Sequence, residues 1–88
     1  MNRTERRLVV RDLPAFVDLL LVGVEMGWSF DQAVAYINEH FRSPVTVLLR
    51  QTYAAIAAGE SRHEALRSLS ERCAIPEFSG LLNTILVT

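Results

Sequence analysis

The residues best suited to chemistry lie in two places where a serine follows a glycine by two positions. Gly59, Ser61 and His63 come in close succession, a grouping that suggests a hydrolase with a serine nucleophile and a histidine base. A nucleophile elbow, however, has glycine on both sides of the serine and joins a strand to a helix. At Ser61 the second glycine is missing and the preceding segment has a helical pattern. The same holds for Gly27 and Ser29, so no catalytic residue and no enzyme activity are predicted.

Metal and cofactor sites are likewise not indicated. Glu39 and His40 are sequence neighbours that point to different helix faces, and His63 is far away, so no two ligands have the i, i+4 spacing of a helical zinc site. The sequence has no glycine-rich loop with a lysine to hold a phosphate. The single cysteine, Cys73, is in line with apolar residues and is interpreted as a small core residue.

Charge is balanced overall but uneven along the chain. Nine arginines and ten acidic residues give a net charge of -1, which argues against nucleic acid as a partner. Arg3, Arg6, Arg7 and Arg11 are concentrated in residues 1–12. That leader is either a solvated, frayed segment or the basic cytoplasmic flank of a membrane span. The chain itself has neither a recognisable span nor a secretory signal.

Five helices and no strands are predicted. The first and most apolar runs from Leu13 to Met26, with Asp12 before it, Pro14 in its first turn and Gly27 at its end. One apolar stripe consists of Leu13, Phe16, Val17, Leu20 and Val24, and a second of Ala15, Leu19, Val22 and Met26. A helix with two apolar faces needs cover on both. We therefore expect it to be the most buried helix, at the centre of a bundle or at an interface.

The second and third helices have clear start signals. Ser29 and Gln32 form a predicted capping box, in which each side chain bonds to the backbone amide of the other residue. The apolar stripe that follows, expected to fold back onto the first helix, consists of Phe30, Ala33, Val34, Ile37 and Phe41. Ser43 and Pro44 then predict the cap and first residue of a third helix, which Gly59 ends.

The fourth and fifth helices follow the same rules. Ser61 and Glu64 predict a second capping box at the start of the fourth helix. Ile75 and Pro76 end that helix, and the stripe of the fifth consists of Phe78, Leu81, Leu82, Ile85 and Leu86. Because no stop signal precedes Thr88, the domain that begins at residue 13 is expected to continue beyond Thr88.

The two corners repeat one another at an offset of thirty-two residues. The matched positions are Gly27, Ser29 and Gln32 in the first corner and Gly59, Ser61 and Glu64 in the second. Helix ends by themselves select glycine and serine at such sites, so the repeat indicates a shared corner structure rather than a shared chemistry. The predicted fold is an all-α bundle of about five antiparallel helices, built from two similar helical hairpins.

Four segments resemble, in order, the cytoplasmic domain of the type II secretion system protein F family. Leu13 to Leu20 is similar to the "LPxxLDLL" opening of that family, and Gly27, Ser29, Ala33 and Val34 resemble the residues that follow it. Gly59 to Leu66, with Leu69 and Arg72, is similar to a later "GxSxxEALxxLxxR" segment. Ile75 to Phe78 resembles the "VPEL" segment of the Tad (Flp) pilus assembly branch.

This resemblance implies a domain of an inner-membrane platform protein in a bacterial pilus or secretion machine. Such a domain lies on the cytoplasmic face of the membrane and contacts the assembly ATPase and other platform subunits. The resemblance implies no cofactor and no enzyme activity. The open apolar surface of the first and fifth helices adds an expectation of self-association.

Two other classes of protein remain as alternatives. A free helical-repeat adaptor of the tetratricopeptide sort is suggested by the repeated corner, but the repeat is shorter than thirty-four residues and only two copies are present. A helix-turn-helix DNA reader is suggested by the short corners. The helix after each corner has acidic residues and lacks the basic face that phosphate contacts require.

The polar faces of the second and fourth helices are the predicted surface for the ATPase. The candidate residues are Asp31, Glu39, Arg62, Arg67 and Glu71, and a plain solvated face is the alternative interpretation for each of them.

Overall fold

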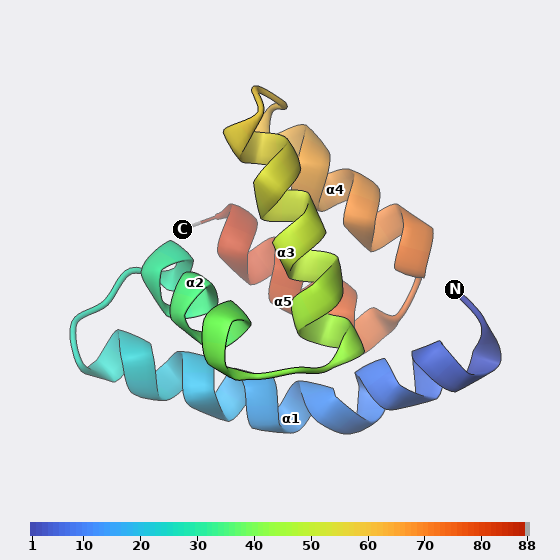
Figure 1. Cartoon of the computed structure of the whole chain (residues 1–88), viewed down its shortest axis with the longest axis horizontal. Helices are drawn as coiled ribbons and strands as arrows, with labels where there is room; N and C mark the ends of the chain where they lie inside the picture. Colours follow the sequence, from blue (N-terminus) through green and yellow to red (C-terminus); the bar gives the residue numbers. More distant parts are fainter. Residues whose placement is uncertain (88) are drawn as a thin grey trace.

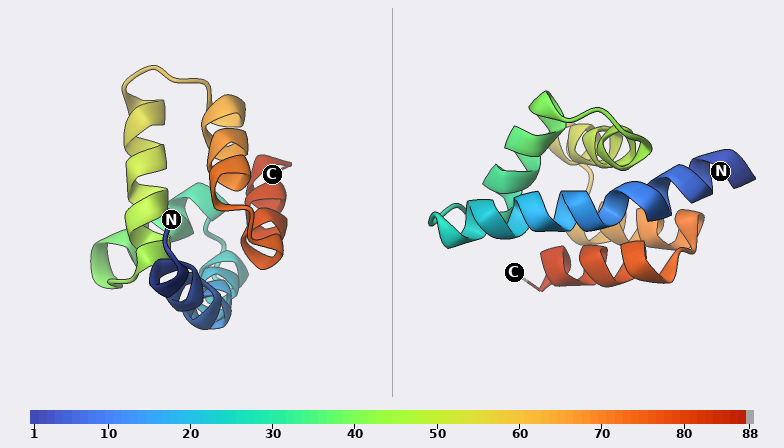
Figure 2. Two further views of the ribbon diagram at one scale, coloured as in Figure 1. Left: turned by 90° about the vertical axis from the view of Figure 1, so that its right-hand side faces the viewer. Right: turned by 90° about the horizontal axis from the view of Figure 1, so that it is seen from below.

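A computed structural model describes residues 1–87 as five helices without a strand. The helices are α1 (Arg3–Glu25), α2 (Phe30–His40), α3 (Pro44–Ala57), α4 (Arg62–Cys73) and α5 (Pro76–Leu86). α1 lies along one edge, and α2, α3 and α5 pack on one side of it (Figure 1). α3 and α4 form an antiparallel hairpin, and α5 lies beside α4 (Figure 2). The predicted all-α bundle is confirmed.

The predicted start of the first helix is wrong by ten residues. α1 begins at Arg3, where the side chain of Asn2 accepts a hydrogen bond of 2.7 Å from the Glu5 amide, and it continues unbroken past residue 12. Val9 is fully buried, so packing on the core stabilises this additional helix. Pro14 stands inside α1 on its exposed side, where water can bond to the Val10 carbonyl that has lost its amide partner. α1 curves around the other helices (Figure 1).

The expectation that the Leu13 to Met26 helix is the most buried is also wrong. Its first stripe packs into the core, with Leu13, Phe16 and Leu20 buried. Its second stripe stays open to solvent, because α2, α3 and α5 all approach from the other side of the helix. The buried centre of the domain is shared among all five helices.

The core of the described residues is one apolar cluster. Its fully buried large side chains are Phe16, Phe78, Leu20, Leu49, Leu66, Leu69, Ile75, Leu82, Ile85, Val9, Val34 and Val45. Of these, Phe16 and Leu20 belong to the first predicted stripe of α1, Val34 to that of α2, and Phe78, Leu82 and Ile85 to that of α5. α5 ends at Leu86, with Val87 as its C-cap, and the predicted continuation of the domain beyond Thr88 lies outside the described residues.

Both glycine corners have the same backbone structure. Gly27 and Gly59 have φ angles of 97° and 115°, the left-handed region in which a Cβ atom is unfavourable. At the first corner the Trp28 amide donates to the Gly23 carbonyl and the Gly27 amide to the Val24 carbonyl, both at 3.0 Å. At the second corner the Glu60 amide donates to the Ala55 carbonyl and the Gly59 amide to the Ile56 carbonyl, again at 3.0 Å. Each helix therefore ends in a Schellman motif.

The serine caps are confirmed, but only one predicted capping box is complete. The Ser29 hydroxyl accepts from the Gln32 amide at 3.1 Å, and the Gln32 side chain accepts from the Ser29 amide at 2.9 Å. Ser61 accepts from the Glu64 amide at 3.3 Å, but the Glu64 carboxylate makes no return bond. That carboxylate is exposed, and water solvates an ionised group more strongly than a neutral amide. A second complete capping box, which was not predicted, joins Ser43 and Thr46.

None of the helices within residues 1–87 combines the length and the hydropathy needed to cross a bilayer.

Candidate interaction surfaces

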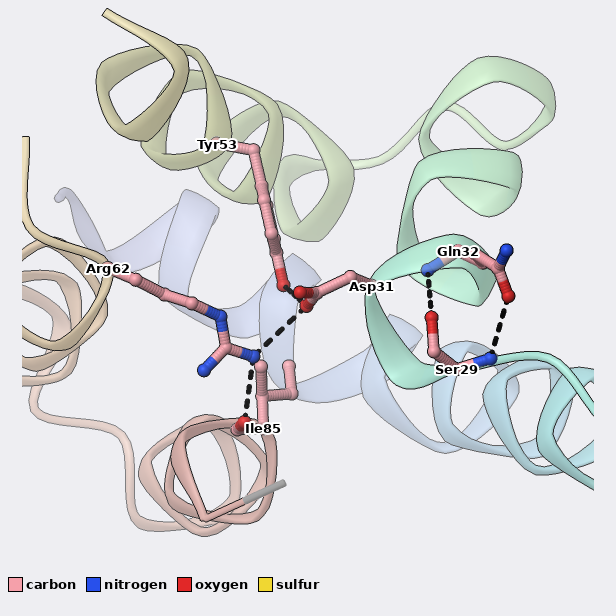
Figure 3. A network of polar contacts seen from close by, with 6 residues as sticks. All are labelled: Ser29, Asp31, Gln32, Tyr53, Arg62 and Ile85. Atoms are coloured by element: carbon pink, nitrogen blue, oxygen red, sulfur yellow. Dashed lines mark hydrogen bonds and ion pairs between the residues drawn. The ribbon is translucent and has the colours of Figure 1, made fainter. Parts of the chain in front are cut away.

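Two of the five predicted partner residues contact one another instead of facing solvent separately. Arg62, the first residue of α4, forms an ion pair with Asp31 of α2 at 3.1 Å (Figure 3). The same Asp31 oxygen accepts a hydrogen bond of 2.8 Å from the Tyr53 hydroxyl of α3. Arg62 also donates to the Ile85 carbonyl in the last turn of α5, at 2.9 Å. One polar network thus joins α2, α3, α4 and α5.

The electrostatics of this network suit the ends of the helices. Asp31 lies in the first turn of α2, where a negative charge is favourable, and the Arg62 guanidinium lies at the carboxyl end of α5, where a positive charge is favourable. The hydrogen bond to Asp31 raises the pKa of Arg62. Both side chains are partly exposed, so water screens the pair and it contributes at most about 1 kcal/mol. The network is better suited to positioning helices than to catalysis.

Tyr53 makes this network sensitive to alkaline pH. Burial, followed by the hydrogen bond to Asp31, raises the pKa of Tyr53 well above its ordinary value of 10.0. The folded chain therefore keeps this proton at pH values where the unfolded chain releases it. We expect the stability that Tyr53 contributes to be fully present below about pH 10 and to be lost progressively above it.

A urea-unfolding series across this pH range tests the expectation. The Tyr53→Phe variant should lose less stability than the wild type between neutral and strongly alkaline pH. Tyr36→Phe, at an exposed site on α2, is the matched control and should follow the wild-type profile. Identical profiles for Tyr53→Phe and the wild type would contradict the assigned role of Tyr53.

Of the other three predicted partner residues, Glu39 lies near this network, whereas Arg67 and Glu71 lie apart from it. Arg67 and Glu71 form an exposed i, i+4 ion pair of 3.3 Å on the outer face of α4. Glu39 lines a shallow hollow of about 440 Å³ between α2 and α3, together with Asp31, Arg42, Arg50 and Tyr53. The Arg50 guanidinium crosses from α3 to donate to the Asn38 carbonyl. The predicted set therefore does not form one continuous surface.

A further surface, which the sequence indicated only in part, is an apolar groove between α1 and α2. Its volume is about 470 Å³, and its α1 wall consists of Leu19, Val22 and Met26. Its α2 wall includes Tyr36 and His40, whose rings stack with centroids 4.3 Å apart. The second apolar stripe predicted the α1 wall. The i, i+4 spacing of the two α2 aromatic residues is the signal that could have predicted the other wall.

The residues first considered for catalysis have structural contacts. The Ser29 and Ser61 hydroxyls both cap helices, and no group of three or more His, Cys, Asp or Glu side chains within residues 1–87 is arranged to hold a metal ion. Cys73 is buried, which raises the pKa of its thiol and disfavours the reactive thiolate.

Comparisons with protein-family models, with curated proteins and with solved structures found no match to this chain. The family resemblance consequently rests on the residues of the chain itself. The fold class rests on the five helices described above.

Proposed function

We propose that the chain is a non-enzymatic scaffold domain of an inner-membrane platform protein for type II secretion or Tad (Flp) pilus assembly. The observation that carries the proposal is the order and spacing of the four segments that resemble the protein F family. They fall in α1, at the two Schellman corners and at the start of α5. Several of their residues, among them Phe16, Leu20 and the two corner glycines, lie where a substitution changes how helices pack or end, so a shared pattern there favours a shared fold.

Two features of the surface support a scaffold role. Asp31, Arg50 and Arg62 each use their charged side chain to join one helix to another. The open apolar groove between α1 and α2 is the kind of surface by which proteins bind other proteins. In the proposed setting the chain lies on the cytoplasmic face of the bacterial inner membrane, as part of a membrane-embedded parent protein.

We assign contact with the assembly ATPase to the polar outer face of α4. Arg67 and Glu71 are both strongly exposed and belong to no network that links α4 to another helix. Exchanging their charges therefore alters the surface without disturbing the core. Glu39, on the rim of the hollow beside α2, is a second contact position.

Binding of the purified chain to its cognate assembly ATPase tests this proposal. The exchange R67E/E71R keeps an ion pair within α4 but inverts the surface pattern, and it should weaken binding about tenfold, or about 1.4 kcal/mol. The matched control R67K/E71D keeps both charges and should bind like the wild type. Circular dichroism confirms that each variant is folded. If the chain, with its neighbouring segments restored, binds neither the ATPase nor another platform subunit, the proposal fails.

One observation favours a second candidate, a free-standing helical-repeat adaptor. The two corners share a Schellman motif and a serine cap at an offset of thirty-two residues, as units of a repeat would. The complete reading frame separates the two candidates. Membrane spans and a second copy of the four segments support the platform protein, whereas further helical hairpins without spans support the adaptor.

A further inference from the structure

The open side of α1 has the residue spacing of a helix that packs along another helix. Its stripe consists of Leu8, Asp12, Ala15, Leu19, Val22 and Met26, in which steps of four and three residues alternate. This is the a/d repeat of a two-helix seam, with Asp12 as its one polar position. Leu19, Val22 and Met26 are 44%, 52% and 67% exposed. Within residues 1–87, the seam has no partner helix.

The groove beside this seam has the shape and lining for an apolar helix. Gly23 and Ala33, two of the smallest residues, lie together where α1 meets α2, and they keep the groove open between its two walls. The aromatic rings of Trp28 and Tyr36 pack edge to face on the α2 side, with centroids 5.2 Å apart. A helix seated on the α1 seam would contact these rings as well.

Charge complementarity indicates which helix fits. One line of exposed charged residues runs along α1 beside the seam. It consists of Arg7, Arg11, Asp18 and Glu25, which follow one another at steps of four, seven and seven residues. The first half of this line is basic and the second half is acidic. A second copy of α1 in antiparallel orientation places each basic half beside an acidic half, whereas a parallel copy places like charges together.

We propose that two copies of this chain pair through α1, antiparallel about a two-fold axis. The seam repeat also sets the register. When Leu19 lies opposite Ala15 of the second copy, Met26 lies opposite Leu8, and Arg11 of the second copy lies between Asp18 and Glu25. The two Asp18 side chains approach one another near the axis, flanked by both Arg11 residues.

The polar seam position fits this register. Asp12 faces Val22 of the second copy; its side chain is only 14% exposed, and its carboxylate is already bonded to Arg11 at 2.9 Å. The pairing therefore buries no new unpaired charge at this position. It also supplies the cover that the two-faced apolar pattern of α1 requires. The inference is independent of the platform proposal, since it involves this chain alone.

The first test is sedimentation velocity of the whole chain from micromolar to near-millimolar concentration. The wild type should show a reversible monomer–dimer equilibrium. Leu19→Asp should weaken dimerisation at least tenfold. Leu21→Asp, on the opposite flank of α1 and 49% exposed, is the matched control and should leave the equilibrium unchanged. A wild type that stays monomeric throughout, or a Leu19→Asp variant that dimerises like the wild type, would overturn the proposal.

Charge inversion tests the antiparallel orientation. R7E/R11E and D18R/E25R should each be monomeric alone, because every basic–acidic contact becomes a contact between like charges. Mixed in equal amounts, they should form a heterodimer. The fourfold variant R7E/R11E/D18R/E25R, whose net charge equals that of the wild type, should dimerise again. Circular dichroism identifies any variant that fails to fold. If a double variant is unfolded, dimerisation of the fourfold variant decides whether the pairing is antiparallel. Retained dimerisation in both double variants, or none in the folded fourfold variant, would refute antiparallel pairing.

Discussion

Replacement of Leu20 by aspartate is expected to leave the chain unfolded at 25 °C. Leu20 is only 2% exposed and lies on the one face of α1 that packs into the core. Loss of the leucine side chain costs about 2–5 kcal/mol, and burial of a carboxylate without a partner costs several more. A domain of this size has a total stability of roughly 5 kcal/mol, so the substitution exceeds what the fold can tolerate.

Far-UV circular dichroism during a thermal scan measures the effect. Leu20→Asp should show low helicity and no cooperative transition. Its neighbour Leu21 supplies the control, since the same change at that exposed position should alter stability by no more than about 0.5 kcal/mol. A cooperative transition of Leu20→Asp near the wild-type temperature would show that the core side of α1 is assigned wrongly.

Signals confined to a few neighbouring residues were sufficient to predict most of the fold. The apolar spacing of α2 to α5, the serine caps and the two glycine corners all depend on contacts within one or two helical turns. Ser43 shows the same principle, because a proline at the next position marks the helix start as clearly as the cap does. Such features can be predicted from a sequence because the residues that interact to produce them are close together in the chain.

The start of α1 was not predictable in this way. Proline strongly favours the first turn of a helix, so Asp12 and Pro14 indicated a beginning at residue 13. That preference was overridden by burial of Val9 against helices distant in sequence, and by the exposed position of Pro14, which limits the cost of its missing hydrogen bond.

The surfaces, too, could be predicted only where they depend on residues close together in the sequence. The open stripe of α1 was visible in the sequence, because it depends on the spacing within one helix. The pairing of Asp31 with Arg62 was not, because the two residues are thirty-one positions apart and meet only after four helices have packed. Sequence spacing therefore identified exposed polar residues but could not show which of them hold the fold together.

Gly23 is the clearest residue whose role only the fold reveals, and its replacement by valine is expected to cost about 2–3 kcal/mol of stability. In the sequence it interrupts the apolar run from Leu13 to Met26. In the structure it is buried, and a Cβ atom built on it would lie 3.0 Å from the Cβ of Ala33 and 3.4 Å from the Trp28 ring. Valine adds two further carbons at this contact, so α2 must move away from α1. The urea midpoint of unfolding should fall accordingly.

The same substitution at Gly80 separates this packing effect from helix propensity. Gly80 is an exposed residue inside α5, and a Cβ atom built on it meets nothing within 4 Å. Valine is a better helix former than glycine by a few tenths of a kcal/mol, a gain that applies at both positions. Gly80→Val should therefore leave the urea midpoint unchanged or slightly higher, while at Gly23 the overpacking outweighs the gain. Equal shifts at the two glycines would show that close approach of α1 and α2 is not what requires glycine at position 23.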